Sequence, residues 1–93
     1  MPKAASPHSH GRSEMWKKPA LKKAIEKERK AFGKAVRKAR EMRGISQEQL
    51  AELAGLHPNY VSRVENGAVN ASLAAIVALA YGLKTTPAKL FSK

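Results

Sequence analysis

Two side chains with strong hydrogen-bonding chemistry stand close together near the middle of the chain. Asn59 carries an amide that can donate and accept at once, and Arg63 carries a planar guanidinium with several donors. The amide can bond adenine bidentately, and the guanidinium can bond the O6 and N7 atoms of guanine. In a helix, Arg63 lies one turn beyond Asn59, so both side chains share the outward face. They are candidates for reading the edges of base pairs.

The residues around this pair predict two short helices joined by a tight turn. Ser46 is a good N-cap, and Gln49 three residues later completes a capping box. Pro58 suits the first position of the second helix, where its missing N–H costs nothing, and His57 is then its cap. Between the helices, Gly55 can adopt the left-handed conformation that lets the chain reverse direction.

The apolar residues of this segment predict one inward face that runs across both helices. Small Ala51 lies where the two helices would cross. The inward positions are Leu50, Ala51, Leu53, Ala54, Leu56, Val61 and Val64.

This arrangement resembles the helix-turn-helix of the lambda repressor and Cro-like (XRE-type) transcriptional regulators. The resemblance covers residues 31–91 and leaves residues 1–30 outside it. It implies an all-α, five-helix DNA-binding domain of the lambda-repressor type. The matching positions in the motif are Gln47, Ala51, Gly55, Val61 and Val64.

The resemblance also implies which residues meet DNA. Proteins of this family lay the second motif helix in the major groove, where its early outward residues reach the bases. Pro58 departs from many relatives, which carry a polar residue there, and offers only apolar contact. The base-reading positions are His57, Pro58, Asn59, Ser62 and Arg63. The positions expected at the DNA backbone are Gln47, Tyr60 and Asn66. For Tyr60 the alternative is a structural role, with its ring packed against the domain, and for Gln47 it is a surface position without DNA contact.

Arg40 and Glu65 resemble a family pair that joins the first helix to the end of the reading helix. If the pair is partly buried, it orients the reading helix, and removal of one partner would leave the other as a buried charge without a counter-ion. If it lies at the surface, it is worth under about 1 kcal/mol.

The charge of the chain independently favours a polyanionic partner. The net charge is +11, and residues 1–43 hold fourteen basic and four acidic side chains, against four and three in residues 44–93. One interpretation is a solubilising tail; beside a DNA-reading motif, we favour an arm that contacts phosphates. The lysines expected at the DNA backbone are Lys17, Lys18, Lys22 and Lys23.

Two domains follow from these patterns: a basic extension over residues 1–30, largely disordered or a frayed helix, and a helix-turn-helix domain over residues 31–93. We favour a first helix over residues 31–43 with partial helix before it, because Gly33 weakens the middle of one long helix. One long helix from Ala20 is the alternative.

The remaining helices follow from glycine and cap signals. Gly44 is placed to end the first helix, and Gly82 to end a strongly apolar helix over residues 72–83. That helix is expected to be substantially buried. Thr86 and Pro87 then start a short last helix.

Length and composition exclude several classes of protein. Ninety-three residues allow one small core and no separate catalytic domain. No cysteine can hold a disulfide or zinc, no apolar run suits a membrane span, and no catalytic arrangement or cofactor motif is recognisable. We therefore expect a cytoplasmic, non-enzymatic protein without a cofactor.

The leading hypothesis is a sequence-specific transcriptional regulator that binds double-stranded DNA at an inverted repeat as a homodimer. Leu90, Phe91 and the exposed part of the apolar helix are the expected dimer interface. The alternative is an antitoxin or adaptor that holds a protein partner, such as a toxin or polymerase, through an exposed apolar patch of Trp16, Leu21 and Ile25. RNA binding is disfavoured because the major groove of A-form RNA excludes a helix.

Overall fold

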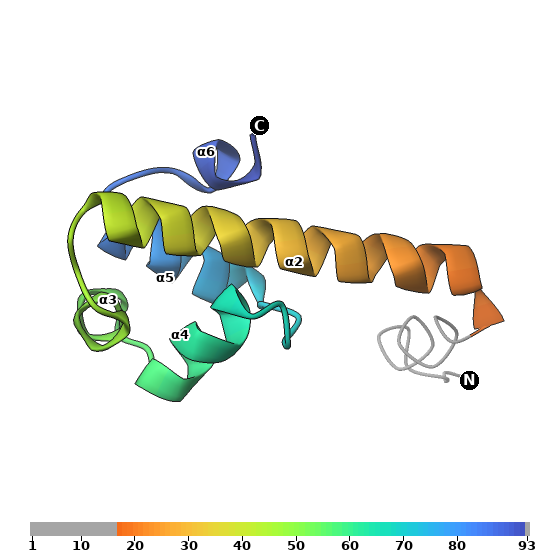
Figure 1. Cartoon of the computed structure of the whole chain (residues 1–93), viewed down its shortest axis with the longest axis horizontal. Coiled ribbons are helices and arrows are strands. Elements are labelled where there is room, and N and C mark those ends of the chain that lie inside the picture. The colour runs from red at the N-terminus through yellow and green to blue at the C-terminus, as the bar shows by residue number, and fades with distance from the viewer. Residues whose placement is uncertain (1–16, 93) are drawn as a thin grey trace, which may run out of the picture.

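The computed structural model describes residues 17–92, which form five α-helices and no strand (Figure 1). The all-helical fold expected from the sequence is confirmed. The basic extension before residue 17, with Trp16, lies outside the described residues. The helices are α2 (Pro19–Met42), α3 (Gln47–Ala54), α4 (Pro58–Glu65), α5 (Leu73–Gly82) and α6 (Pro87–Phe91).

The first described helix is one continuous element of 24 residues, so the start favoured at residue 31 was wrong and the long-helix alternative holds. Pro19 opens α2, and Gly33 in its middle is buried. A Cβ atom at Gly33 would lie 2.3 Å from the carbonyl oxygen of Val64 and 2.7 Å from that of Glu65. Glycine is therefore needed here because the backbones of α2 and α4 approach closely, which offsets its helix-weakening effect.

The end of α2 and the turn between α3 and α4 follow the expected glycine signals. Gly44 and Gly55 both have φ of 69°, the left-handed conformation. After α2, the Gly44 N–H donates to the carbonyl of Glu41 and the Ile45 N–H to that of Arg40, which is the Schellman pattern.

Both helices of the motif begin as their caps predict. Ser46 Oγ accepts from the Gln49 N–H at 3.0 Å, and the Gln49 side chain accepts from the Ser46 N–H at 2.7 Å. His57 Nδ1 accepts from the Asn59 N–H at 3.1 Å. The caps at Ser46 and His57, with three hydrogen bonds between them, therefore fix where α3 and α4 start.

The core lies where α2, α3, α4 and α5 meet. Its largest fully buried side chains are Leu50, Leu79, Val36, Val61 and Val64. In Figure 1, α4 and α6 lie on opposite sides of α2, and α3 packs against both α4 and α5.

Two expected burial assignments are wrong. Leu53 was placed on the inward face but is 51% exposed, because Leu50, Ala51 and Ala54 already fill the faces of α3 that meet α4 and α5. Leu90 was expected at a dimer surface but is only 5% exposed and belongs to the core.

α5 differs in two ways from the helix predicted over residues 72–83. Gly82 is its last residue but does not supply the left-handed turn, which falls on Lys84 with φ of 56°. Instead, a Cβ atom at Gly82 would lie 3.0 Å from Leu50 Cδ1, so this glycine permits close packing against α3. Only one face of α5 is buried, and Val77 on the other face is 50% exposed. No helix among the described residues is long and apolar enough to cross a membrane.

Candidate nucleic-acid interface

The expected base-reading residues gather on the outward side of α4. Val61 and Val64 point into the core, and the opposite side of the helix carries polar groups. His57, Asn59 and Arg63 are exposed, whereas Pro58 and Ser62 are half-buried.

The cap of α4 also sets the donor that His57 presents. Its Nδ1 atom accepts from the Asn59 N–H, so in the neutral ring the proton is on Nε2. Nε2 can then donate to a base or a phosphate. One residue thus fixes the helix start and offers a hydrogen-bond donor beside it.

At the other end of α4, the carboxylate of Glu65 is buried within a cluster of cationic and amide donors. Its side chain has no exposed surface. Arg40 Nε donates to Oε2 at 2.6 Å, and a second Arg40 nitrogen donates to Oε1 at 3.0 Å. Gln47 Nε2 and Arg37 Nε donate to the same Oε1, at 3.0 and 3.3 Å. We call these four residues the Glu65 cluster.

The electrostatics keep both members of the central pair charged. Burial alone would raise the pKa of Glu65, but hydrogen bonds from Arg40, Gln47 and Arg37 outweigh it and hold the pKa below its usual value. The hydrogen bond to Glu65 in turn raises the pKa of Arg40. The cluster is therefore a true ion pair at neutral pH.

The Glu65 cluster joins three helices. Arg37 and Arg40 come from α2, Gln47 opens α3, and Glu65 closes α4. Arg40 also donates to the carbonyl of Ile45 at 2.9 Å, which ties the loop after α2 to the same point. The structure therefore places the expected pair of Arg40 and Glu65 in contact and largely buries it.

The sequence did not predict Arg37 as a member of the cluster, nor the contact of Gln47 with Glu65. Arg37 lies one turn before Arg40 on α2, and that spacing could have indicated a shared partner. Gln47 was assigned to DNA only, yet one hydrogen of its amide goes to Glu65. Since an amide nitrogen has two hydrogens, the second can still donate to a phosphate.

The other expected backbone-binding residues fall into two groups. In the first group, Asn66 is exposed beside α4, and its Oδ1 accepts a hydrogen bond from Arg37 at 3.1 Å. Tyr60, also in this group, is half-buried and packs against the core. The second group is exposed around the start of α2 and consists of Lys17, Lys18, Lys22 and Lys23. The structure does not bring this group together with the outward face of α4.

Comparison with known proteins identifies the same motif. A family model described as helix-turn-helix matches residues 36–90. The control protein C.SmaI of Serratia marcescens is 43% identical over 49 residues, which make up 53% of this chain and 58% of that protein. The chain thus spans little more than half the length of this relative.

Two solved structures share the fold. The restriction-modification controller protein C.AhdI of Aeromonas hydrophila has 44% sequence identity and a TM-score of 0.67, over 68% of this chain and 96% of its own. A hypothetical transcription factor, NHTF, from Neisseria has 34% identity and a TM-score of 0.67, over 70% of this chain and 75% of its own.

Substitution of Arg40 tests whether the Glu65 cluster is a structural element. Arg40→Ala leaves a buried carboxylate without its main partner, so we expect a loss of about 3–5 kcal/mol in the free energy of unfolding. Arg37→Ala is the matched control: the Arg37 side chain is 46% exposed, and its removal should cost under about 1 kcal/mol. Urea unfolding of both variants and the parent measures the difference. A loss for Arg40→Ala that is also under about 1 kcal/mol would show that Arg40 contributes no more than a surface contact.

Proposed function

The chain belongs to the XRE-type helix-turn-helix family of DNA-binding transcriptional regulators, and on this premise we propose that it binds an inverted-repeat operator in double-stranded DNA as a homodimer. The proposal places it among regulators similar to the restriction-modification controllers that it resembles. The observation that carries it is the outward face of α4, where Asn59 and Arg63 stand exposed on a helix anchored at its far end by the Glu65 cluster.

In this proposal α4 lies in the major groove and reads bases from its first two turns. Asn59 bonds adenine, Arg63 bonds guanine, and the His57 Nε2–H donates to a base or a nearby phosphate. Ser62 can bond either class of base, and Pro58 offers an apolar surface to a thymine methyl group. A rigid helix favours such readout because bidentate bonds require fixed geometry.

Phosphate contacts adjoin the base-reading residues. Gln47 at the start of α3 and Asn66 after α4 supply amide donors near the C-terminal end of α4, where Gln47 also bonds Glu65 and Asn66 bonds Arg37. Tyr60 supplies a hydroxyl group. The lysines around the start of α2 add charge that attracts any DNA sequence. These are Lys17, Lys18, Lys22 and Lys23.

The dimer is proposed from an apolar surface on α5. Leu73, Val77 and Tyr81 recur every four residues and are 76%, 50% and 77% exposed, so they form one stripe on the face that the core leaves uncovered. A single small domain buries little DNA, and two copies related by a two-fold axis would double the contact. This stripe, and not Leu90, is the proposed dimer interface, because Leu90 is buried in the core. Phe91 is half-exposed and stacks on Phe32 with ring centroids 4.9 Å apart.

Substitution of Val77 tests the dimer interface. Val77→Glu places a charge in the centre of the α5 stripe, so we expect dissociation into monomers and weaker binding to an inverted repeat, with binding to an isolated half-site little changed. Leu53→Glu is the control, since Leu53 is 51% exposed on α3 and lies outside the stripe. Sedimentation equilibrium measures the oligomeric state. A Val77→Glu protein that remains dimeric would refute this interface.

Arg63→Ala tests base reading. If Arg63 bonds guanine, alanine should cost about 1–3 kcal/mol on the best operator and relax preference at one base pair per half-site, with nonspecific affinity nearly unchanged. The measurement is a set of affinities at fixed salt on operators recovered by selection from a random pool and then substituted one base pair at a time. Uniform weakening across the set would make Arg63 a phosphate contact. Recovery of no consensus by the parent would contradict sequence-specific binding altogether.

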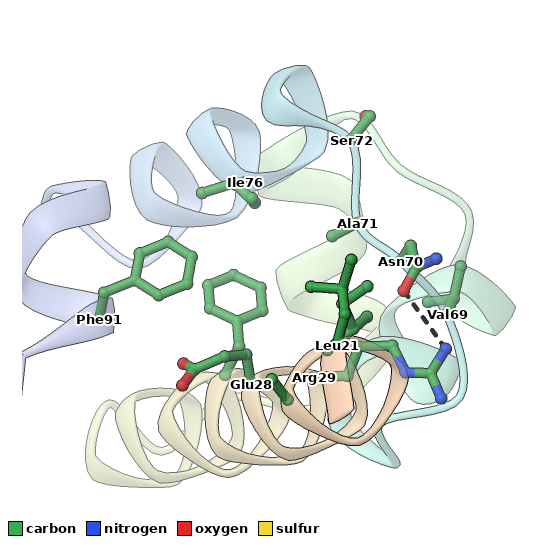
Figure 2. A pocket seen from close by; sticks show the side chains of 12 residues that line it. Leu21, Glu28, Arg29, Val69, Asn70, Ala71, Ser72, Ile76 and Phe91 are labelled. Atoms are coloured by element: carbon green, nitrogen blue, oxygen red, sulfur yellow. Dashed lines mark hydrogen bonds between the residues drawn. The ribbon is translucent and has the colours of Figure 1, made fainter. Parts of the chain in front are cut away.

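One observation favours the second candidate function, a protein-binding adaptor or antitoxin. Leu21 and Ile25 of the expected apolar patch line a groove of about 710 Å³ between the first half of α2, the loop before α5, and Phe91 (Figure 2). At its rim, Arg29 donates to Asn70 Oδ1 at 3.3 Å. Titration with a purified candidate toxin separates the two functions, because an adaptor would bind the toxin with Leu21 at the contact and a regulator would not.

A further inference from the structure

Five basic residues form a single line along α2. Lys23, Lys27, Lys30, Lys34 and Arg37 are spaced alternately four and three residues apart, which places them on one face of a helix. We call this line the α2 stripe. Lys22 does not belong to it, because neighbouring residues of a helix are turned by about 100° from each other. The four lysines of the stripe are all exposed.

Two contacts show which way the stripe faces. Arg37 donates to Asn66 Oδ1 at 3.1 Å, and Asn66 directly follows α4. Lys30 lies against the turn after α4: a Cβ atom added at Gly67 would be only 2.9 Å from Lys30 Cγ. The stripe therefore adjoins the end of the helix proposed to read DNA. From there α2 extends toward its N-terminal end beyond the other helices (Figure 1), and the stripe continues along it with Lys27 and Lys23.

The charges of the stripe are not neutralised within the described part of the chain. None of its four lysines forms an ion pair there. Arg37 is the one stripe residue that does, with Glu65, which also pairs with Arg40. α2 as a whole carries nine basic and three acidic side chains. Like charges four residues apart on a helix repel and destabilise it, so a row of them is unfavourable unless a polyanion binds along it.

We propose that the α2 stripe binds the phosphate backbone of the DNA that flanks each half-site. This inference rests on the proposed function and extends it to a second, sequence-independent contact surface. From residue 23 to residue 37 the helix rises about 21 Å, which matches about six base pairs of duplex. The stripe would lengthen the contacted DNA by that amount and fix the register of α4 without reading sequence.

The test compares two variants that each lose two positive charges. Lys27→Gln with Lys34→Gln removes the two stripe charges on either side of Lys30. Lys84→Gln with Lys89→Gln is the control, since both lysines are exposed and lie on the loop after α5 and on α6, away from α4. Affinities of the full chain are measured against salt concentration on a 40-base-pair duplex of random sequence and on the selected operator with flanks of 2 or 10 base pairs.

We expect the stripe variant to lower the slope of log affinity against log salt by about 1.8, or about 0.9 for each lost phosphate contact, on the random duplex. The control should leave the slope within about 0.5 of the parent. On the operator, longer flanks should tighten binding of the parent and the control but not of the stripe variant.

Equal salt slopes for the stripe variant and the control would overturn the inference. It would also be overturned if the stripe variant bound the operator with 10-base-pair flanks more tightly than the operator with 2-base-pair flanks, as the parent is expected to do. The proposed function fails by a different result, the absence of any consensus in selection with the parent. In that case the slopes on the random duplex still decide whether the stripe binds phosphates.

Discussion

The buried carboxylate of Glu65 is the interaction on which the arrangement of this molecule depends. A carboxylate without contact to water is strongly unfavourable unless donors surround it, and here Arg40, Arg37 and Gln47 supply four hydrogen bonds. Because the donors come from α2 and α3 and the acceptor from α4, the bonds form only when the three helices hold one relative placement. Gly33 completes the constraint, since only glycine lets the α2 backbone approach the last turn of α4 so closely.

This constraint connects stability with DNA binding. The outward residues of α4 stand on a helix fixed at its start by the His57 cap and at its end by the Glu65 cluster. Arg37 belongs both to the cluster and, through Asn66, to the edge of the proposed DNA surface. Charges along α2 then lie beside the helix proposed to read DNA, whereas the apolar stripe of α5 occupies a separate face. One small core would thus carry the proposed reading helix, the proposed phosphate-binding surface and the proposed dimer interface.

Local signals in the sequence predicted much of this fold. The caps at Ser46 and His57 and the left-handed turns at Gly44 and Gly55 depend on residues close in the chain, and the structure has them where expected. The match of residues 36–90 to the helix-turn-helix family confirms the resemblance first seen in the motif.

What the sequence did not predict depends on contacts between distant segments. Local signals predict that Gly33 weakens a helix and that Gly82 ends one. In the structure, close packing of α2 against α4 requires Gly33, and Gly82 permits close packing of α5 against α3. The exposure of Leu53 and the burial of Leu90 depend on which helix faces are already covered. Gln47 was given a single role because nothing in its neighbourhood along the chain indicates Glu65, eighteen residues away.

The pH dependence of unfolding tests the central role of Glu65 most directly. Its pKa is held below the ordinary value of 4.5, so its contribution to stability is present above that pH and is lost as the pH falls through the folded-state pKa. The measurement is the free energy of unfolding in urea for the parent and for Glu65→Gln, from pH 7 to pH 3. We predict that the parent is the more stable at pH 7 and that the difference shrinks steadily below about pH 4.5. A difference that stays constant across this range would contradict the account, because it would mean that the charge on Glu65 does not hold the helices together.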